Sequence, residues 1–582
     1  MKRYLFCLSL AVTLALPSAA APTQLVDEAP SSIQHRPDGS FLIDFGKVSF
    51  ANLRLAAPAG RPAEITVHLG ESLLENRVNR KPPGSVRYAA IKLSLDGKVP
   101  SIAAPAPDKR NTTHPSAVLT PPEWGVILPF RWVEIEGWPG ELCPEHITRR
   151  SAFLTAWDDS AASFTSSDPR LNGIWELCKY SIKATTFAGI YVDGDRERIP
   201  YEADAYLNQI SHYTTDRDLQ IARDSFDFLI KKPTWPSEWP PHMVFMAYAD
   251  FMHTADIAWL APRYEALKSK LLTSRARADG LIQSNAAQIS RDDIVDWPTT
   301  ERDGYVFTPI NTVVNAFHLR TLTLMAEMAT ALGKTVDAED FTAREKKARA
   351  AFQEILFNPA TGSYRDGEGT DHSSQHANLF SLAFHLVPEE NRVAVTRAIL
   401  QKQMACSVYA AQYLLEGLFQ NELGREALTL ITAPTDRSWK HMFESGTTIT
   451  WEAWDQKHKP NQDWNHAWGA APANLFPRFI LGAQALTPGW KRTLIRPHPG
   501  DLKSASGKIP TPSGPILIQW ENANNFRLTV TLPVNLNAQI ELPATPESSG
   551  VMLNGQSVSA KRVANRWILS DAITGTATLE VK

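Results

Sequence analysis

The chain has 582 residues and a formal net charge of −3 at pH 7, from 62 acidic and 59 basic side chains. This near balance creates no field that would gather nucleic acid or an anionic membrane, so it favours a neutral partner. The length exceeds what one hydrophobic core organises and predicts about two to four domains. The 17 tryptophans are many, and exported proteins that bind sugars use such rings as stacking platforms.

The first 21 residues have the order of a secretory signal peptide. Lys2 and Arg3 precede an apolar stretch over residues 4–16, and small residues lead to Ala21, where we expect cleavage. No later stretch approaches the roughly 20 apolar residues that a membrane span needs. We therefore expect an exported protein, periplasmic or secreted, without membrane insertion.

Three cysteines remain after the expected cleavage: Cys143, Cys178 and Cys406. Their wide spacing makes neither a disulfide framework nor a metal cluster. We expect ordinary buried thiols, because a free cysteine packs as a small hydrophobe.

Residues 22–160 are predicted to form an N-terminal β-sandwich. Residues 41–45, 63–69 and 130–137 read as strands, several with apolar and polar residues in alternation. Residues 100–122, rich in proline, alanine, threonine and asparagine, are expected to be a long surface insertion between strands.

Residues 161–487 are predicted to be helical. Ser167-Asp168-Pro169 supplies a cap and an early proline before apolar positions at helical spacing. One helix is expected to end at Gly333, and a second helical pattern follows it. Long helices joined by polar loops that carry tryptophan favour stacked helical hairpins in an (α/α)6 barrel, a multidomain architecture with a sandwich on either side.

Residues 488–582 are predicted to form a C-terminal β-sandwich. Alternating apolar residues return at 516–520, 528–532 and 540–542, and Asn554-Gly555 reads as a tight hairpin turn.

The densest polar cluster of the chain lies at residues 191–204. It has five carboxylates and two arginines, with apolar and aromatic residues on both sides. A solvated loop is the plain interpretation of such a run, but its flanks predict that some of the charges are partly buried. Packing carboxylates together raises the pKa of one of them, which is how a general acid is made at neutral pH.

A second cluster combines carboxylates with tryptophan. Trp451-Glu452-Ala-Trp454 is followed by His466 and Trp468, which fits a sugar-binding wall with a catalytic carboxylate set into it. A glutamate between two buried tryptophans would be unfavourable without a partner, which disfavours a purely structural helix. Weaker support comes from three loops that pair polar groups with aromatics, at residues 235–240, 292–303 and 375–378.

The order of these segments resembles glycoside hydrolase family 78, the α-L-rhamnosidases, over nearly the whole mature chain. The acidic loop of that family reads Asp-Cys-Pro-Gln-Arg-Asp-Glu-Arg-Leu-Gly-Trp-Thr-Gly-Asp. In this chain Glu197-Arg198, Tyr201 and Asp204 keep its spacing. Upstream the chain departs from the family, since the Cys-Pro-Gln element is missing and Asp193 lies closer to the glutamate.

The resemblance implies an inverting glycosidase that cleaves terminal α-L-rhamnosyl linkages of glycans or glycosides. It implies Glu197 as the general acid and Glu452 as the general base, with Asp193, Asp204, Trp297 and His466 holding the sugar. The clusters themselves add further substrate-binding candidates: Arg196, Tyr201, Trp239, Asp296, Trp451 and Trp468. No metal or organic cofactor is expected, because no His/Cys/Asp spacing makes a convincing metal site.

Two kinds of alternative stay open. One is another α/α-barrel glycosidase, or a polysaccharide lyase, acting on a different sugar, because one fold serves many chemistries. The other is a glycan-binding protein without catalysis.

Overall fold

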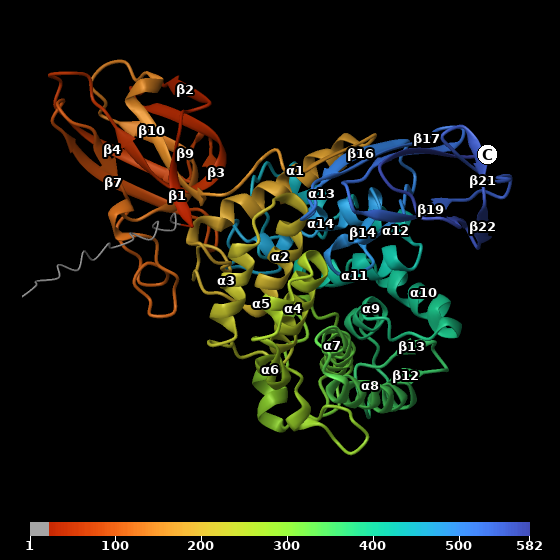
Figure 1. The fold of residues 1–582 in the computed structure, drawn as a ribbon. Helices are drawn as coiled ribbons and strands as arrows, with labels where there is room; N and C mark the ends of the chain where they lie inside the picture. The colour runs from red at the N-terminus through yellow and green to blue at the C-terminus, as the bar shows by residue number, and fades with distance from the viewer. Residues whose placement is uncertain (1–21) are drawn as a thin grey trace, which may run out of the picture.

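The computed structural model describes residues 22–582, and the predicted signal peptide lies outside them. An N-terminal sheet stands to one side of a helical body, and C-terminal strands cover another side of that body (Figure 1). None of the described helices is long and apolar enough to cross a membrane. Cys178 and Cys406 are buried as predicted, and Cys143 is half-buried.

The N-terminal part is a mainly antiparallel sheet built around one long strand, β3. Its central order is β1-β10-β3-β9-β4-β7, with β2 and β8 also pairing with β3. The three strands predicted from alternation are confirmed as β3, β4 and β9. The strands of this part are β1 Thr23–Glu28, β2 Ser32–His35, β3 Phe41–Leu55, β4 Ala63–Gly70, β5 Leu73–Leu74, β6 Arg77–Val78, β7 Tyr88–Leu95, β8 Ser101–Ala103, β9 Leu128–Glu136 and β10 Ile147–Leu154.

The segment at 100–122 is more than the surface insertion that its composition predicted. It contributes β8 to the sheet, and the Val118 amide donates to the Arg198 carbonyl at 2.9 Å. Asn111 is buried and its side-chain amide donates to the Asp195 carbonyl. The composition of a segment indicates polar residues and turns. It does not show whether another part of the chain covers that segment.

The helical body begins as predicted. Helix α1 starts at Pro169, and the Asp168 carboxylate caps it by accepting from the Arg170 amide at 2.9 Å. The predicted break at Gly333 separates α7 from α8. The helices are α1 Pro169–Ala184, α2 Glu202–Thr215, α3 Gln220–Leu229, α4 Trp239–Thr254, α5 Ile257–Leu260, α6 Tyr264–Leu267, α7 Thr312–Ala331, α8 Thr335–Leu356, α9 Gln375–Ala383, α10 Arg392–Lys402, α11 Val408–Gln420, α12 Gly424–Ile431, α13 Trp439–Glu444 and α14 Pro472–Leu475.

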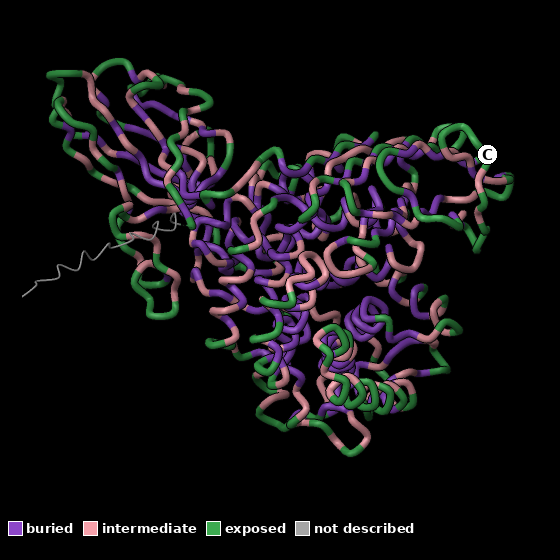
Figure 2. Tube along the Cα trace, in the orientation of Figure 1, coloured by how far each residue is buried: buried purple, intermediate pink, exposed green. Residues whose placement is uncertain are grey.

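Inner and outer helices differ in how much of their surface is apolar. Helices α2, α4, α7, α9 and α11 contact one another in succession and are buried over most of their residues. Helix α8 packs on α7 but buries residues along one stripe only, so its other face meets solvent (Figure 2). A helix that is buried on most of its faces lies in the interior, whereas an amphipathic one can stand outside.

The C-terminal strands form a seven-stranded and a five-stranded sheet. Asn554-Gly555 turns between β20 and β21 as predicted, with positive φ at both residues. Strand β11, expected to belong with the helices, pairs instead with β16 of the seven-stranded sheet. The strands are β11 Ser163–Ser166, β14 Ala483–Ala485, β15 Arg492–Ile495, β16 Ser504–Ile509, β17 Ile516–Asn522, β18 Phe526–Thr531, β19 Asn537–Pro543, β20 Val551–Leu553, β21 Gln556–Val558, β22 Ala560–Val563, β23 Arg566–Leu569 and β24 Thr576–Val581, beside a small β12 Phe357–Asn358 and β13 Ser363–Tyr364 hairpin.

Candidate active site

A cavity of about 240 Å³ opens where α2 and α4 begin. Loops from four distant parts of the chain close around these two helix starts. The lining residues are Asp193, Arg196, Glu197, Tyr201, Asp204, Trp235, Pro236, Trp239, Ile294, Trp297, Glu452, His466 and Trp468. Carboxylates and tryptophans therefore face one enclosed space, the combination that suits a sugar ring.

Ten of the twelve residues predicted from the sequence line this cavity, and Asp296 and Trp451 do not. The Asp296 carboxylate is buried and accepts from His376 Nε2 at 2.6 Å and from the Ser407 amide at 2.9 Å. It also accepts from the Trp297 amide at 2.8 Å, so it fixes the residue that does reach the cavity. Its acceptor positions are used inside the protein and none remains for a sugar.

Trp451 lies outside the cavity for a packing reason. Its ring stacks on Trp464 with centroids 5.2 Å apart and planes at 19°. The neighbouring Glu452 carboxylate points into the cavity instead. The sequence places tryptophan and glutamate side by side, and it could not show which of these adjacent side chains faces the cavity.

Five residues that help to form the site were absent from the predicted set. Trp235 is 49% exposed at the cavity mouth, and its place in a Trp-Pro-Ser-Glu-Trp-Pro motif was the available signal. Ile294 and Pro236 give no signal through their own side chains, because apolar lining residues look like core residues in a sequence. Lys459 and Asp463 contact Glu452 or His466, although Lys459 sits in a Lys-His-Lys run typical of a solvated loop.

Glu197 stands at the mouth of the cavity. Its carboxylate accepts from the Tyr201 hydroxyl at 3.1 Å, and Arg196 Nε lies 3.5 Å from its other oxygen. The side chain keeps 38% exposure, so a substrate oxygen can approach it. The neighbouring Asp193 is buried, and burial followed by repulsion from Glu197 raises the pKa of Asp193 well above its usual value.

Asp193 also has an oxygen without a hydrogen-bond partner in the described chain. Its Oδ1 accepts from the Ile199 amide at 2.9 Å, while its buried Oδ2 has no hydrogen-bond partner within residues 22–582. A buried polar atom left without a partner is unfavourable, so such an atom in a cavity marks a place for a ligand hydroxyl.

Glu452 is the buried glutamate of the cavity. It accepts from Arg196 Nη1 at 2.8 Å, and Lys459 Nζ lies 3.3 Å from its other oxygen. Burial, together with the nearby Asp463, raises the pKa of Glu452 in spite of these two cations. Arg196 thus touches both glutamates, which lie 255 positions apart in the sequence.

His466 is held between two carboxylates. Its Nε2 lies 2.8 Å from Asp204 and its Nδ1 lies 3.3 Å from Asp463. Burial alone would lower the pKa of His466, but Asp463 and Asp204 outweigh it and raise the pKa well above the usual value. The ring is therefore an imidazolium at neutral pH, with both N–H groups committed to carboxylates.

The same charges argue against a metal site. One ligand atom each from Glu452, Asp463 and His466 lies within 4.8 Å of the others. A metal ion there would have to displace the proton that Asp204 and Asp463 hold on His466, and it would compete with Arg196 and Lys459 for Glu452. This arrangement suits proton transfer and hydrogen bonding to a polar ligand.

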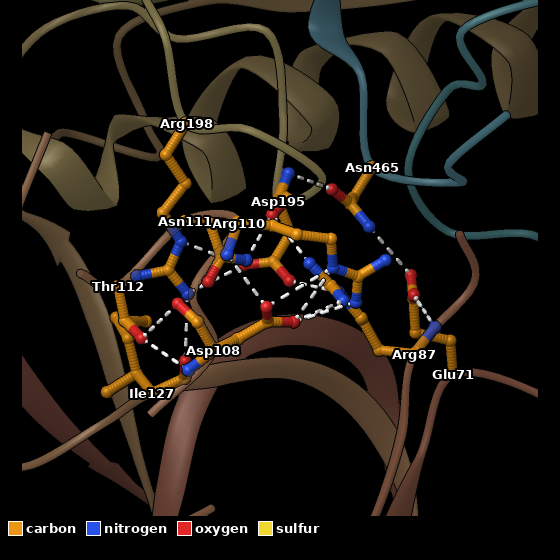
Figure 3. A network of polar contacts seen from close by, with 10 residues as sticks. All are labelled: Glu71, Arg87, Asp108, Arg110, Asn111, Thr112, Ile127, Asp195, Arg198 and Asn465. Atoms are coloured by element: carbon orange, nitrogen blue, oxygen red, sulfur yellow. Dashed lines mark hydrogen bonds and ion pairs between the residues drawn. The ribbon is translucent and has the colours of Figure 1, made fainter. Parts of the chain in front are cut away.

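The N-terminal sheet fixes the loop that carries Glu197 (Figure 3). The buried Asp195 carboxylate is held by Arg198 Nη2 at 2.6 Å and by an ion pair with Arg87, which precedes β7. The Asp195 amide donates to Asn465 Oδ1 at 2.7 Å, and the Asn465 amide in turn donates to Glu71 at 3.1 Å. The loops of Glu197 and His466 are therefore tied to each other and to the N-terminal part.

Gly194 allows the loops of Glu197 and His466 to approach each other closely. Its φ is +111°, and a Cβ there would lie 2.8 Å from the Asp463 carboxylate and 2.9 Å from the Asn465 carbonyl. Only glycine fits both the backbone conformation and the space.

Family models match three consecutive parts of the chain. The bacterial alpha-L-rhamnosidase 6 hairpin glycosidase domain matches residues 159–480, more than half of the chain. The bacterial alpha-L-rhamnosidase concanavalin-like domain matches 34–153, and the bacterial alpha-L-rhamnosidase C-terminal domain matches 482–556.

Two curated relatives are both called alpha-L-rhamnosidase. One, from Alteromonas sp. (strain LOR), is 27% identical over 451 residues, covering 71% of this chain and 48% of the relative. The other, from Streptomyces avermitilis, is 23% identical over 561 residues, covering 90% and 50%. The chain thus spans about half the length of these relatives.

Solved structures share the fold. The alpha-L-rhamnosidase from Dictyoglumus thermophilum superposes with a TM-score of 0.79 at 19% identity, covering 96% of this chain and 63% of that one. The Streptomyces avermitilis enzyme complexed with L-rhamnose gives 0.78 at 19% identity, covering 96% and 54%. Taken with the family models, this arrangement of sheet, helical body and C-terminal strands shows that the chain belongs to the family of bacterial α-L-rhamnosidases with a six-hairpin glycosidase domain.

Proposed function

We propose that the protein hydrolyses terminal α-L-rhamnosyl linkages of glycans or rhamnosylated glycosides, with Glu197 as acid and Glu452 as base. One observation carries this proposal. The cavity brings the two glutamates against different nitrogens of the Arg196 guanidinium, Glu197 at Nε and Glu452 at Nη1, beside four tryptophans. Membership of the rhamnosidase family, and relatives called alpha-L-rhamnosidase, support the choice of sugar.

In the proposed reaction Glu197 gives its proton to the glycosidic oxygen as that bond breaks. Glu452 takes a proton from a water molecule, whose oxygen forms the new bond to the anomeric carbon. The exposed position of Glu197 suits contact with the leaving group, and the buried position of Glu452 suits a water at the base of the cavity.

In this proposal the remaining lining residues bind the sugar. The rings of Trp235, Trp239, Trp297 and Trp468 offer apolar faces, and the free oxygen of Asp193 offers a hydrogen-bond partner for a hydroxyl. The imidazolium of His466 orients Asp204. The opposed glutamates fit hydrolysis better than β-elimination, which would need a base near a uronate carboxylate.

The substrate is tested by comparing aryl α-L-rhamnoside with other aryl glycosides. We expect the rhamnoside to be cleaved fastest. Rapid cleavage of another glycoside with none of the rhamnoside would overturn the sugar and leave the hydrolase proposal standing. If no glycoside is cleaved and Glu197→Gln and Glu452→Gln leave glycan affinity unchanged, the protein is a binder.

We further propose that hydrolysis inverts the anomeric configuration. An inverting pair stands roughly 6.5–9.5 Å apart to admit water, against about 5–5.5 Å for a retaining pair. The guanidinium between the two glutamates supports the wider arrangement. Proton NMR of the first-formed sugar should show the β-anomer from an α-glycoside, and an α-anomer would rule out the role of Glu452 as base.

The same proposal covers architecture and export. We propose a signal peptide at 1–21, a β-sandwich at 22–160, an (α/α)6 barrel at 161–487 and a β-sandwich at 488–582. The sheets and inner helices described above support this division. N-terminal sequencing of the protein from the periplasm or medium should begin close to residue 22, and an intact Met1 on cytoplasmic protein would contradict export.

A further inference from the structure

A second cavity, of about 290 Å³, lies at the opposite ends of the inner helices. The candidate active site uses the first turns of α2 and α4, whereas this cavity uses their last turns, at Tyr213 and His253. Strand β14 and Trp490 of the C-terminal part close one side. We call it the distal cavity.

Aromatic packing separates the distal cavity from the active site. The rings of Phe245, Phe317, Tyr409 and Tyr413 pack in the middle of the helical body, with centroids 5.7 to 6.0 Å apart. His242 Nε2 and the Tyr413 hydroxyl, 2.8 Å apart, join this packing. The distal cavity is therefore a separate site and no extension of the first.

The distal cavity has an aromatic floor. Tyr206, Phe245, Phe384 and Tyr413 line it, and the ring of Tyr248 stands half-buried at its side. The volume of about 290 Å³ is at the small end for ligand sites, which typically run from about 300 to 1,000 Å³. It suits one six-membered ring lying on aromatic faces.

One cation in the distal cavity has no hydrogen-bonded or ion-paired partner among residues 22–582. Arg478 pairs with Glu416 and donates to Asn474 at 3.0 Å. Arg320, on α7, lines the same cavity and makes no hydrogen bond or ion pair with any residue from 22 to 582. Its five N–H donors are arranged to bind a carboxylate through two parallel bonds.

The other polar groups compensate this charge only in part, through the nearby Glu416, whose pKa Arg320 helps to lower. The Glu416 carboxylate is already held by Arg478, and it also accepts from Gln412 at 3.1 Å. Burial lowers the pKa of His253 to about 4, so this ring adds no charge at neutral pH. The buried Oε1 of Gln420 has no partner within the described chain and can accept from a ligand hydroxyl.

We propose that the distal cavity binds a ring-bearing monocarboxylate, with the ring on the aromatic floor and the carboxylate paired bidentately with Arg320. A hydroxyl on that ring would satisfy Gln420. Two sources supply this chemistry, namely a hexuronate unit of a glycan and a hydroxylated aromatic acid.

The test is isothermal titration of the full chain with glucuronate and with 4-hydroxybenzoate, beside neutral glucose and phenol. We expect at least one carboxylate to bind and its neutral counterpart to bind at least ten-fold more weakly. Arg320→Gln should weaken the carboxylate at least ten-fold, and Arg320→Lys should weaken it less. Arg397→Gln, an exposed arginine on α10, is the matched control and should change nothing.

A variant of the active site shows at which of the two cavities the carboxylate binds. Trp297→Ala should leave carboxylate binding intact. Binding of glucuronate identifies the glycan source, and binding of 4-hydroxybenzoate alone identifies the aromatic one. The proposal is overturned if neither acid binds at millimolar concentration, or if Trp297→Ala abolishes binding while Arg320→Gln retains it. Circular dichroism checks folding, and Tyr248→Ala provides a second variant that should weaken binding by removing a ring.

Discussion

At the scale of single residues, the site is organised around Arg196. The guanidinium contacts the half-exposed Glu197 and the buried Glu452, and Glu452 contacts Lys459 as well. Two carboxylates that face one cavity repel each other, and a cation between them reduces that repulsion. Arg196 is thus a positioning residue as well as part of the cavity wall.

The acid role of Glu197 predicts a dependence on the leaving group. Glu197→Gln removes the proton donor, so kcat on a natural glycoside should fall by about 10² to 10⁴. An activated aryl leaving group needs little proton donation and should lose much less. Steady-state kinetics on both substrates check this, with Glu123→Gln, an exposed glutamate, as the control. Equal losses on both substrates would mark Glu197 as structural.

The contact between Arg196 and Glu452 predicts a shift in the pH profile. Arg196 lowers the pKa of Glu452, so Arg196→Met should raise that pKa. Because the base must be ionised, the acid limb of the kcat/KM profile should move to higher pH, by about one unit or more. Arg196→Lys keeps the charge and should shift the limb less. An unchanged limb in Arg196→Met would exclude Glu452 as the base.

At the scale of elements, the loop at 193–204 depends on the N-terminal sheet. Asp195 is fully buried and shares its carboxylate between Arg87 and Arg198, and Asn111 binds its carbonyl (Figure 3). The loop next to Glu197 is therefore shaped by residues that precede it by about one hundred positions.

Loss of one partner of Asp195 should affect stability and catalysis together. Arg87→Gln leaves a buried carboxylate with a weaker partner, a change that costs about 3–5 kcal/mol when a buried pair is broken. We expect a lower Tm and a lower kcat, measured by thermal unfolding and steady-state kinetics. Arg110→Gln removes a 55% exposed guanidinium of the same region and should leave both near wild type. A wild-type kcat in Arg87→Gln would show that the loop holds its shape alone.

At the scale of the whole molecule, the three parts differ in whether they share a hydrophobic core. The helical body and the C-terminal strands share one hydrophobic core, whereas the N-terminal sheet has a core of its own. Small apolar clusters, one with Phe50 stacked on Phe187, join that sheet to the helical body. Polar contacts join it to the active-site loops, and buried Glu71 lies among them, accepting from Asn465.

Glu71 predicts how stability depends on pH. Burial raises the pKa of Glu71 to about 8, against 4.5 for the unfolded value. Between those pH values Glu71 keeps its proton in the folded protein and releases it in the unfolded chain. The contribution of Glu71 to the free energy of unfolding therefore falls as pH rises through this window. The slope from this group approaches about 1.4 kcal/mol per pH unit. Thermal unfolding from pH 5 to 8 should therefore show a smaller decline for Glu71→Gln than for wild type.

An exposed glutamate of the same sheet provides the comparison. Glu64→Gln should follow the wild-type decline, since Glu64 is exposed on β4. The interpretation of Glu71 fails if Glu71→Gln and Glu64→Gln give the same pH dependence.

The sequence by itself determined the parts whose signals are local. Periodicity located β3, β4, β9, α1 and the turn at 554–555, because alternation and capping depend on neighbouring residues. The pairing of carboxylates with tryptophan, together with the resemblance to the rhamnosidase family, identified ten residues of the cavity.

Only the tertiary structure decided the relations between distant segments. It turned Asp296 and Trp451 away from the cavity, brought Lys459 to Glu452, and placed Asn111 beneath the acidic loop. It also placed Arg320 in the distal cavity without a hydrogen-bonded or ion-paired partner in the described part of the chain. Which side of the chain a residue faces, and which opposite charge meets it, are set by contacts far apart in sequence, and no local pattern encodes them.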